Sequence, residues 1–294
     1  MDFSVIGKKI KELRKSVGFS QRDLARDICT QAQISKIEKG DVLPLASTLY
    51  FISQRLGVDI NYFFDLGTTP RLDYVQEVNN QLKLARRKLD YPLIKEIVEI
   101  EEKNPLFTTN KKNYQTLLWH KAIYEYHVNH HAEKALSLVD KAITLTFEKV
   151  WAEREIEIII SKGIFLYEEG RYEEALDIYL PAKDHLDDII YLNDETIRSR
   201  LLYNMAKAFT KLENYKQSIN VCEQAIQTCI RKDLLFLLGE LHYHIGYNYE
   251  LRNQFHLAKK FMQQALDIFH LQKNDQYSDF IHKKMVIFDK HLQY

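Results

Sequence analysis

Glycine and proline are scarce in this sequence of 294 residues, which contains nine glycines and five prolines. Because these two residues supply most tight turns, their scarcity argues against a β-sandwich or barrel and favours long helices. No apolar run approaches the roughly 18 residues that a membrane-spanning helix needs. The N-terminal segment is charged and amphipathic, so it does not have the continuous apolar core of a secretion signal. We therefore expect a soluble, cytoplasmic, all-α protein.

Cysteine is also rare, with three residues at Cys29, Cys222 and Cys229. None of them forms the C-x-x-C pair typical of metal and redox sites, and an odd number fits a reducing compartment. Cys222 and Cys229 lie seven residues apart, on one face of a predicted helix. We expect both to pack as small apolar side chains.

The chain carries no net charge, because 41 basic residues balance 41 acidic ones. Residues 1–40, however, contain nine lysines and arginines against five acidic residues. A local basic excess on an otherwise acidic chain is typical of a surface that binds phosphate groups. The charge distribution therefore places a candidate nucleic-acid interface in the N-terminal segment.

The first 66 residues contain four short predicted helices. Apolar residues at helical spacing predict the first helix, and Gly18 ends it. Ser20 with Asp23 three residues later predicts an N-terminal capping box, and Thr30 is expected to cap the next helix. The helices expected after the first are Gln21–Ile28, Gln31–Lys39 and Ala46–Leu56. The residues expected to complete the core are Val58, Ile60, Phe63 and Phe64.

Two short helices, a tight turn between them and a polar outer face on the second are typical of a helix-turn-helix. The segments 18–25 (GFSQRDLA) and 34–40 (ISKIEKG) resemble the lambda-repressor-like Xre and phage-repressor family. In this arrangement the helix at 31–39 enters the major groove of DNA with Ile34 and Ile37 facing inward. The side chains expected to face the DNA are Gln31, Gln33, Ser35 and Lys36. Glutamine can pair with adenine through two hydrogen bonds, and lysine can donate to the acceptors of guanine.

The resemblance to phage repressors implies two further roles. Gln21 occupies the position at which a glutamine of those repressors holds a DNA phosphate, a contact that sets register without reading sequence. Arg14 and Glu38 are expected to form a partly buried ion pair that ties the first helix to the third.

The rest of the chain has an internal period. Small residues at Ala135, Ala175, Ser218 and Ala258 are separated by 40, 43 and 40 residues. Each is followed seven residues later by an alanine (Ala142, Ala182, Ala225, Ala265) and preceded twelve residues earlier by Ile123, Gly163, Ala206 or Gly246. This framework resembles the tetratricopeptide repeat, although its period is longer than the 34 residues of that repeat. With a weaker copy over residues 82–104, we expect a right-handed α-solenoid of about five helix pairs and a C-terminal capping helix near 276–292.

A solenoid of helix pairs has no obvious catalytic cleft, but it presents a concave groove lined by the first helix of each pair. Asparagine amides can bond an extended backbone, and tyrosine rings can cover ligand side chains at low entropic cost. The repeat framework gives these candidate groove residues: Tyr124, Tyr167, Asn204, Lys207, Tyr243 and Tyr247.

The combination of these two parts resembles the RNPP family of quorum-sensing regulators from Gram-positive bacteria, especially its PlcR-type members. The local match is residues 28–38 (ICTQAQISKIE), where the turn is one residue shorter than in most Xre proteins. The resemblance implies a homodimer that binds a two-fold operator on double-stranded DNA and regulates transcription with RNA polymerase at its target promoters. It also implies that a short signalling peptide occupies the repeat groove.

The same resemblance gives a domain organisation. Residues 1–66 are expected to form the DNA-binding domain and residues 71–294 the domain for peptide sensing and dimerisation, with 71–89 as a linker helix that merges into the first repeat. In PlcR-type proteins a basic pair near the first repeat engages carboxylates of the peptide. Arg86 and Lys88 occupy what resembles that position.

Three other functions are alternatives to this one. A regulator whose solenoid docks a protein partner would bind the same operator but ignore short peptides. A repeat protein that inhibits partners without binding DNA is disfavoured by the intact recognition helix. Catalysis is disfavoured because His242 and His244 would point to different faces of a helix, His130 and His131 have no partnering ligand set, and no phosphate-binding glycine loop or nucleophile elbow is present. We therefore predict a regulator that is not an enzyme, with no catalytic residues, no metal site and no cofactor.

Overall fold

The computed structural model describes residues 3–147 and 151–291, and its regular secondary structure within those ranges is entirely helical. The chain divides into two compact units, Met1–Leu117 and Leu118–Tyr294. The all-helical fold expected from the sequence is confirmed.

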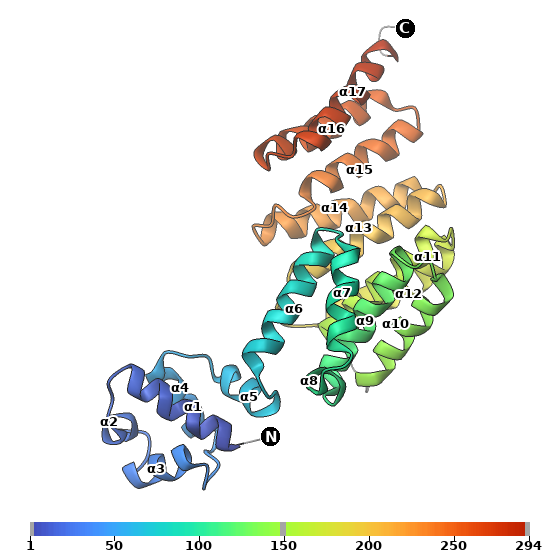
Figure 1. Cartoon of the computed structure of the whole chain (residues 1–294). Helices are drawn as coiled ribbons and strands as arrows, with labels where there is room; N and C mark the ends of the chain where they lie inside the picture. Colours follow the sequence, from blue (N-terminus) through green and yellow to red (C-terminus); the bar gives the residue numbers. More distant parts are fainter. Residues whose placement is uncertain (1–2, 148–150, 292–294) are drawn as a thin grey trace. The chain divides into compact units, whose positions relative to one another are not determined.

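The first unit begins with the helices of the predicted helix-turn-helix (Figure 1). Its helices are α1 (Phe3–Ser16), α2 (Gln21–Ala25), α3 (Gln31–Lys39), α4 (Ala46–Leu56), α5 (Ile60–Thr68), α6 (Leu72–Arg87), α7 (Tyr91–Glu101) and α8 (Pro105–Thr108). The first five surround one apolar core that includes Ile6, Ile10, Leu24, Ile34, Ile37, Ile52 and Phe63. The predicted caps are confirmed: Ser20 and Asp23 form the capping box, Thr30 caps α3, and Gly40 ends it in the left-handed conformation.

Two expectations for this core are wrong in detail. The second helix ends at Ala25 instead of Ile28, because Asp27 adopts a positive φ of 58° that interrupts the helical backbone. Phe63 is fully buried, but the neighbouring Phe64 is 36% exposed and does not complete the core.

A glycine allows α1 and α3 to approach closely. A Cβ atom at Gly7 would lie 2.1 Å from the backbone oxygen of Ile37. Any larger residue would therefore force the two helices apart. This spacing brings Arg14 of α1 within reach of Glu38 on α3.

The remaining helices follow one another as antiparallel pairs (Figure 1). They are α9 (Lys111–His127), α10 (Ala132–Thr146), α11 (Glu153–Glu168), α12 (Tyr172–Asp188), α13 (Thr196–Lys211), α14 (Tyr215–Arg231), α15 (Leu238–Leu251), α16 (Phe255–Leu271) and α17 (Asp275–His291). Together with α6 and α7 they make five helix pairs, and α17 packs against α16 as the terminal helix. The predicted repeat number and the capping helix are confirmed, and the predicted end of that helix at Leu292 lies outside the described residues.

The framework of small residues accounts for the close packing inside each pair. All twelve framework positions are buried in the second unit. A Cβ atom at Gly163 would lie 2.2 Å from the ring of Tyr179, and one at Gly246 would lie 2.8 Å from Met262. The small residues are therefore required by contact with a large side chain on the second helix of the same pair.

Additional residues lie between the pairs and lengthen the period. The connection from α12 to α13 spans residues 189–195 and carries Ile190, which is fully exposed, and Tyr191, which is 77% exposed. These side chains contribute nothing to the core of the repeats. The connections inside the pairs α11–α12 and α13–α14, by contrast, have only three residues.

The three cysteines are free thiols. Cys222 and Cys229 are fully buried, as predicted, and Cys29 is half-buried. Burial raises the thiol pKa of all three cysteines above its ordinary value.

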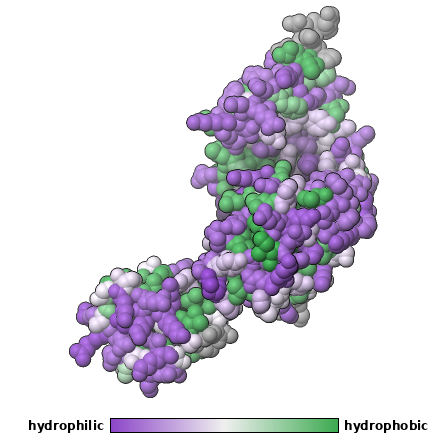
Figure 2. Space-filling view, in the orientation of Figure 1, coloured by the Kyte–Doolittle hydropathy of each residue, from purple (hydrophilic) through white to green (hydrophobic). Residues whose placement is uncertain are grey.

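The visible face of the molecule is mostly hydrophilic, with scattered hydrophobic patches (Figure 2). Among the described helices, none is both long enough and apolar enough to cross a lipid bilayer.

Candidate functional site

The outer face of α3 carries the four residues expected to face DNA. Gln31 and Lys36 are exposed, and Gln33 and Ser35 are half-buried. Ile34 on the opposite face is completely buried, and so is Ile37. The hydroxyl of Thr30 accepts a hydrogen bond of 3.1 Å from the backbone N–H of Gln33, which fixes the start of the helix.

The ion pair between Arg14 and Glu38 is present, as the resemblance implied. The guanidinium donates from Nε at 2.5 Å and from Nη2 at 3.0 Å to the two carboxylate oxygens. Arg14 is 8% exposed and Glu38 is 4% exposed. Burial alone would raise the pKa of Glu38, but hydrogen bonds from Arg14 and Gln21 outweigh it and hold that pKa below its ordinary value.

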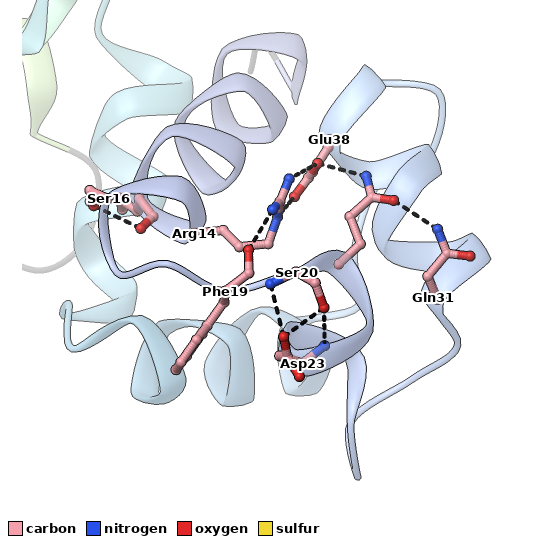
Figure 3. A network of polar contacts seen from close by, with 9 residues as sticks. Arg14, Ser16, Phe19, Ser20, Asp23, Gln31 and Glu38 are labelled. Carbon is pink, nitrogen blue, oxygen red and sulfur yellow. Dashed lines mark hydrogen bonds and ion pairs between the residues drawn. The ribbon is translucent and has the colours of Figure 1, made fainter.

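A chain of hydrogen bonds continues from this buried pair to the surface of α3 (Figure 3). The side-chain amide of Gln21 donates to Glu38 at 2.8 Å, and its carbonyl oxygen accepts from Gln31 at 2.7 Å. Because a carboxylate can only accept, this arrangement fixes which way the Gln21 amide points. Gln31, a candidate base-reading residue, is thereby positioned by the core. The sequence analysis predicted these residues and the Arg14–Glu38 pair, but not the hydrogen bonds that join the pair to Gln21 and Gln31.

Arg55 of α4 has a role that the sequence analysis missed. Its Nη1 donates to the backbone oxygens of Asp23 and Leu24, both at 3.2 Å, and to that of Arg26. These are carbonyl groups at the end of α2, where no helical partner is available. The only sequence signal was a basic residue near the end of α4, which many surface helices share.

In the second unit, the first helices of the last three pairs lie next to one another, since α11 contacts α13 and α13 contacts α15. We call the surface they form the α11–α13–α15 face. At its centre the ammonium of Lys207 lies 4.6 Å from the ring centroid of Tyr167 and 6.0 Å from that of Tyr203. Burial raises the pKa of Tyr167 to about 12 and lowers the pKa of Lys207 from its ordinary value.

Tyr243 and Tyr247 continue this face along α15. Their rings are parallel, with centroids 6.3 Å apart, and Tyr243 also contacts Phe280 of α17. Lys284 lies 5.1 Å from the ring of Tyr247, and it is paired with Glu250 at 2.6 Å. The first helices of the last three pairs therefore form one continuous face, as the repeat framework indicated. The predicted residues that lie on this face are Tyr167, Lys207, Tyr243 and Tyr247.

The two remaining groove candidates of this unit differ in accessibility. Asn204 is half-buried and donates to the backbone oxygen of Arg200 at 2.8 Å, which orients its amide. Tyr124 is only 4% exposed, so it is part of the packing between helices and not an open wall as expected. The repeat framework predicts which helix carries a residue, but it does not predict how much of the side chain neighbouring residues cover.

The basic pair Arg86 and Lys88 lies at the end of α6 in the first unit. Arg86 is half-buried within the last turn of the helix, whereas Lys88 is exposed and forms the C-cap. The backbone N–H of Lys88 donates to Leu84 at 3.0 Å. Basic residues at this end of a helix interact favourably with its dipole.

A buried polar cluster lies beneath the α11–α13–α15 face. Thr210 Oγ1 is 2.9 Å from each of Ser218 Oγ, His244 Nε2 and Asn248 Oδ1. Asn248 donates to Ser218 at 3.1 Å, and Ser218 donates to the backbone oxygen of Ala206 at 2.8 Å. Each of the four side chains thus has a polar partner within the cluster, which joins α13, α14 and α15.

No group of three or more histidine, cysteine or acidic side chains within the described ranges has a metal-binding arrangement. Nε2 of His244 lies 2.9 Å from Thr210 in the polar cluster, and His131 pairs with Glu125 at 2.9 Å.

The geometry defines a class of protein: a helix-turn-helix regulator with a helical-repeat domain. Family comparisons agree with it, because residues 7–66 match a family described as a helix-turn-helix domain and residues 78–290 match the RNPP family C-terminal domain. The chain belongs to the RNPP family, a family of DNA-binding, peptide-responsive regulators. No curated protein matches the chain.

Several solved structures share this fold. PlcR from Bacillus thuringiensis, in complex with the peptide PapR7 and DNA, has a TM-score of 0.86 at 20% identity, covering 95% of this chain and 99% of that chain. ComR from S. thermophilus, in complex with DNA and its signalling peptide ComS, has a TM-score of 0.65 at 18% identity, covering 97% and 99%. The pheromone receptor Rgg2 from Streptococcus dysgalactiae has a TM-score of 0.63 at 17% identity, covering 97% and 99%.

Proposed function

We propose that this chain is a sequence-specific DNA-binding transcriptional regulator whose activity is controlled by a short intracellular signalling peptide bound by its repeat domain. The observation that carries the proposal is the presence, on one chain, of a helix-turn-helix with a positioned polar face and an RNPP C-terminal domain. The structures of PlcR and ComR named above contain both DNA and a signalling peptide. Such a regulator acts in the cytoplasm, where its DNA lies.

The DNA-binding half rests on α3 and Gln21. Gln31, Gln33, Ser35 and Lys36 are the candidates for contact with base edges in the major groove. Gln21 lies at the start of α2, where it is the candidate for a phosphate contact that sets the register.

The peptide-binding half rests on the α11–α13–α15 face, with Arg86 and Lys88 as separate candidates in the first unit. Aromatic rings and oriented amides are the groups that recognise short peptides at low entropic cost. The candidates on this face are Tyr167, Asn204, Lys207, Tyr243 and Tyr247.

The proposal includes a domain organisation and a homodimer. Residues 1–66 form the DNA-binding domain, 71–89 a linker helix that merges into the first repeat, and 71–294 the domain for sensing and dimerisation. A symmetric dimer matches a two-fold operator whose half-site spacing the dimer sets. At target promoters the dimer acts together with RNA polymerase.

Selection of duplexes from a random-sequence library by the purified chain tests the DNA half. Lys36→Ala is expected to weaken binding to the selected duplex by about 1–3 kcal/mol while changing binding to random duplex far less. Lys103→Ala, which replaces an exposed lysine outside the helix-turn-helix, serves as the control. Equal losses on both duplexes would remove Lys36 from base reading, and selection of no preferred sequence would refute the function itself.

Titration of the chain with synthetic heptapeptide libraries, monitored by affinity for the selected duplex, tests the peptide half. We expect peptides to be retained and to change the affinity for DNA. Replacing both Arg86 and Lys88 by alanine is expected to abolish the response with the fold intact. DNA selectivity without any response to peptides would instead favour a protein partner for the repeat domain.

A further inference from the structure

Lys207 is a half-buried cation between aromatic rings on the α11–α13–α15 face. Its ammonium lies over Tyr167 and at the limit of contact with Tyr203. Rings attract a cation through their electron-rich faces, but they do not accept its hydrogen bonds as a carboxylate does. Two aromatic contacts therefore leave the three N–H donors of Lys207 without a strong acceptor.

Other half-buried cations of the second unit are paired. Arg200 binds Glu157 at 2.9 Å, Lys284 binds Glu250 at 2.6 Å, and Lys162 binds Asp140 at 2.7 Å. Lys207 makes no hydrogen bond or ion pair with any residue that the structure describes. Lys207 differs in this respect even from Arg200, which lies two helical turns away on the same helix and has an acidic partner.

The acidic residue whose charge acts on Lys207 does not pair with it. Glu168 influences the pKa of Lys207, but no ion pair or hydrogen bond joins the two side chains in the described structure. Burial lowers the pKa of Lys207, since desolvation disfavours the charged form. An incoming anion would therefore meet a cation that has already given up part of its hydration.

A second buried polar atom nearby also lacks a partner. Oε2 of Glu240, in the first turn of α15, is buried and accepts no hydrogen bond from the described residues. Its charge acts on Tyr203, which lies one helical turn before Lys207 on α13. Lys207 thus lies beside the ring of Tyr203, and Glu240 acts on the same residue through its charge. An inorganic anion could satisfy only the donor, whereas a peptide supplies both a carboxylate and N–H groups.

We propose that Lys207 binds a carboxylate of the signalling peptide, so that this face selects peptides carrying an acidic side chain or a free C-terminus at that point. This inference rests on the proposed peptide-binding function and gives the chemistry that the site requires. Lys207 is a specificity-determining residue, with Tyr167 and Tyr203 as the walls of its site.

Three matched libraries of random heptapeptides without other acidic residues test the proposal. The first has glutamate at its central position and an amidated C-terminus, the second has glutamine there and is amidated, and the third has glutamine and a free C-terminal carboxylate. Each is incubated with the full chain, and the retained peptides are quantified by mass spectrometry. We expect about tenfold greater retention of the first or third library than of the second, the effect of one charged hydrogen bond.

Variants then assign the preference to Lys207. Lys207→Met and Lys207→Gln are expected to abolish it, and Lys207→Arg is expected to keep it. Lys211→Met is the control, since Lys211 is exposed one turn further along α13. Thermal unfolding of each variant checks that it is folded.

Two results would overturn the role of Lys207 alone: equal retention of the three libraries by the wild-type chain, or an acidic preference that survives in both Lys207→Met and Lys207→Gln. Retention of none of the libraries would instead contradict the proposed peptide-binding function, and this inference with it. The preferred library, first or third, identifies the carboxylate as a side chain or a C-terminus.

Discussion

Two polar networks, one in the helix-turn-helix and one in the repeats, differ in where they end. In the helix-turn-helix, hydrogen bonds run from the buried Arg14–Glu38 pair through Gln21 to Gln31 at the surface (Figure 3). In the repeats, the cluster of Thr210, Ser218, His244 and Asn248 is closed on itself. An open network can position a residue for an outside partner, whereas a closed one can only hold helices in register.

The largest expected effect is on the open network at its buried end. Glu38→Ala leaves the Arg14 guanidinium buried without its partner, which costs about 3–5 kcal/mol. Native-state hydrogen exchange of the α1 and α3 amides in the full chain measures this loss of stability. The double variant Arg14→Met/Glu38→Leu is expected to lose much less. A single variant as stable as the double one would mean that the pair is not the anchor of this network.

As the pH decreases, the helices joined by the closed cluster around His244 are expected to lose stability before the helices joined by the Arg14–Glu38 pair. Burial lowers the pKa of His244 to about 4, whereas an unfolded histidine has a value near 6.5. The unfolded state therefore takes up a proton first, and stability at α13–α15 falls by about 3 kcal/mol as the pH decreases from 6.5 to 4.

Glu38 behaves differently, since its pKa is depressed below the ordinary value of 4.5. Its stabilising contribution is complete above pH 4.5 and is lost only below it. Hydrogen exchange as a function of pH should thus show loss of protection in α13–α15 ahead of α1 and α3. His244→Gln is expected to reduce the earlier loss, to which His242 of α15 also contributes because burial lowers its pKa. Simultaneous loss in both regions would contradict the difference in pKa.

A smaller effect is expected from Ser218→Ala. Alanine occupies the equivalent framework position in the other repeats, at Ala135, Ala175 and Ala258. At position 218, however, it would deprive Asn248 and Thr210 of a buried partner, at a cost of about 1–3 kcal/mol. Urea unfolding measures the change, with the exposed Ser137→Ala as control. An unchanged free energy of unfolding would show that the cluster tolerates the loss of one hydrogen-bonding side chain.

The smallest expected change in stability is at the surface end of the open network. Gln31→Ala should alter the free energy of unfolding by no more than about 0.5 kcal/mol. Its affinity for a duplex selected from random sequences should nevertheless fall, because Gln31 is a candidate for contact with bases. Fluorescence anisotropy with selected and random duplexes measures both affinities. Unaltered affinity for the selected duplex would mean that Gln31 does not contact bases and only donates its hydrogen bond to Gln21.

The local elements were predictable because their signals are local. Ser20, Thr30 and Gly40 predicted helix ends through cap chemistry, and the framework around Gly163 predicted close helix pairs. The end of α2 was predicted too late, since no rule of composition identifies Asp27 as a residue with positive φ. Helical periodicity likewise could not distinguish Phe63 from Phe64 at a helix start.

The links between distant side chains were not predictable from one sequence. Thr210 and His244 are 34 residues apart, and whether they meet depends on the rotation of α13 and α15 about their axes. The same dependence explains Tyr124, which lies on the expected helix but is covered. Arg55 donates hydrogen bonds to backbone carbonyl groups. Because every residue has such a group, the sequence does not indicate which residues Arg55 contacts. The Arg14–Glu38 pair was foreseen only through the resemblance to phage repressors.

The protection of the three thiols has a practical consequence for labelling. Cys222 and Cys229 are covered, and the raised pKa of each cysteine keeps it in the unreactive protonated form at neutral pH. Ile190, by contrast, projects fully into solvent from the connection between α12 and α13. The variant Ile190→Cys would therefore carry a single reactive thiol, where a fluorophore can report on ligand binding without removal of any native cysteine.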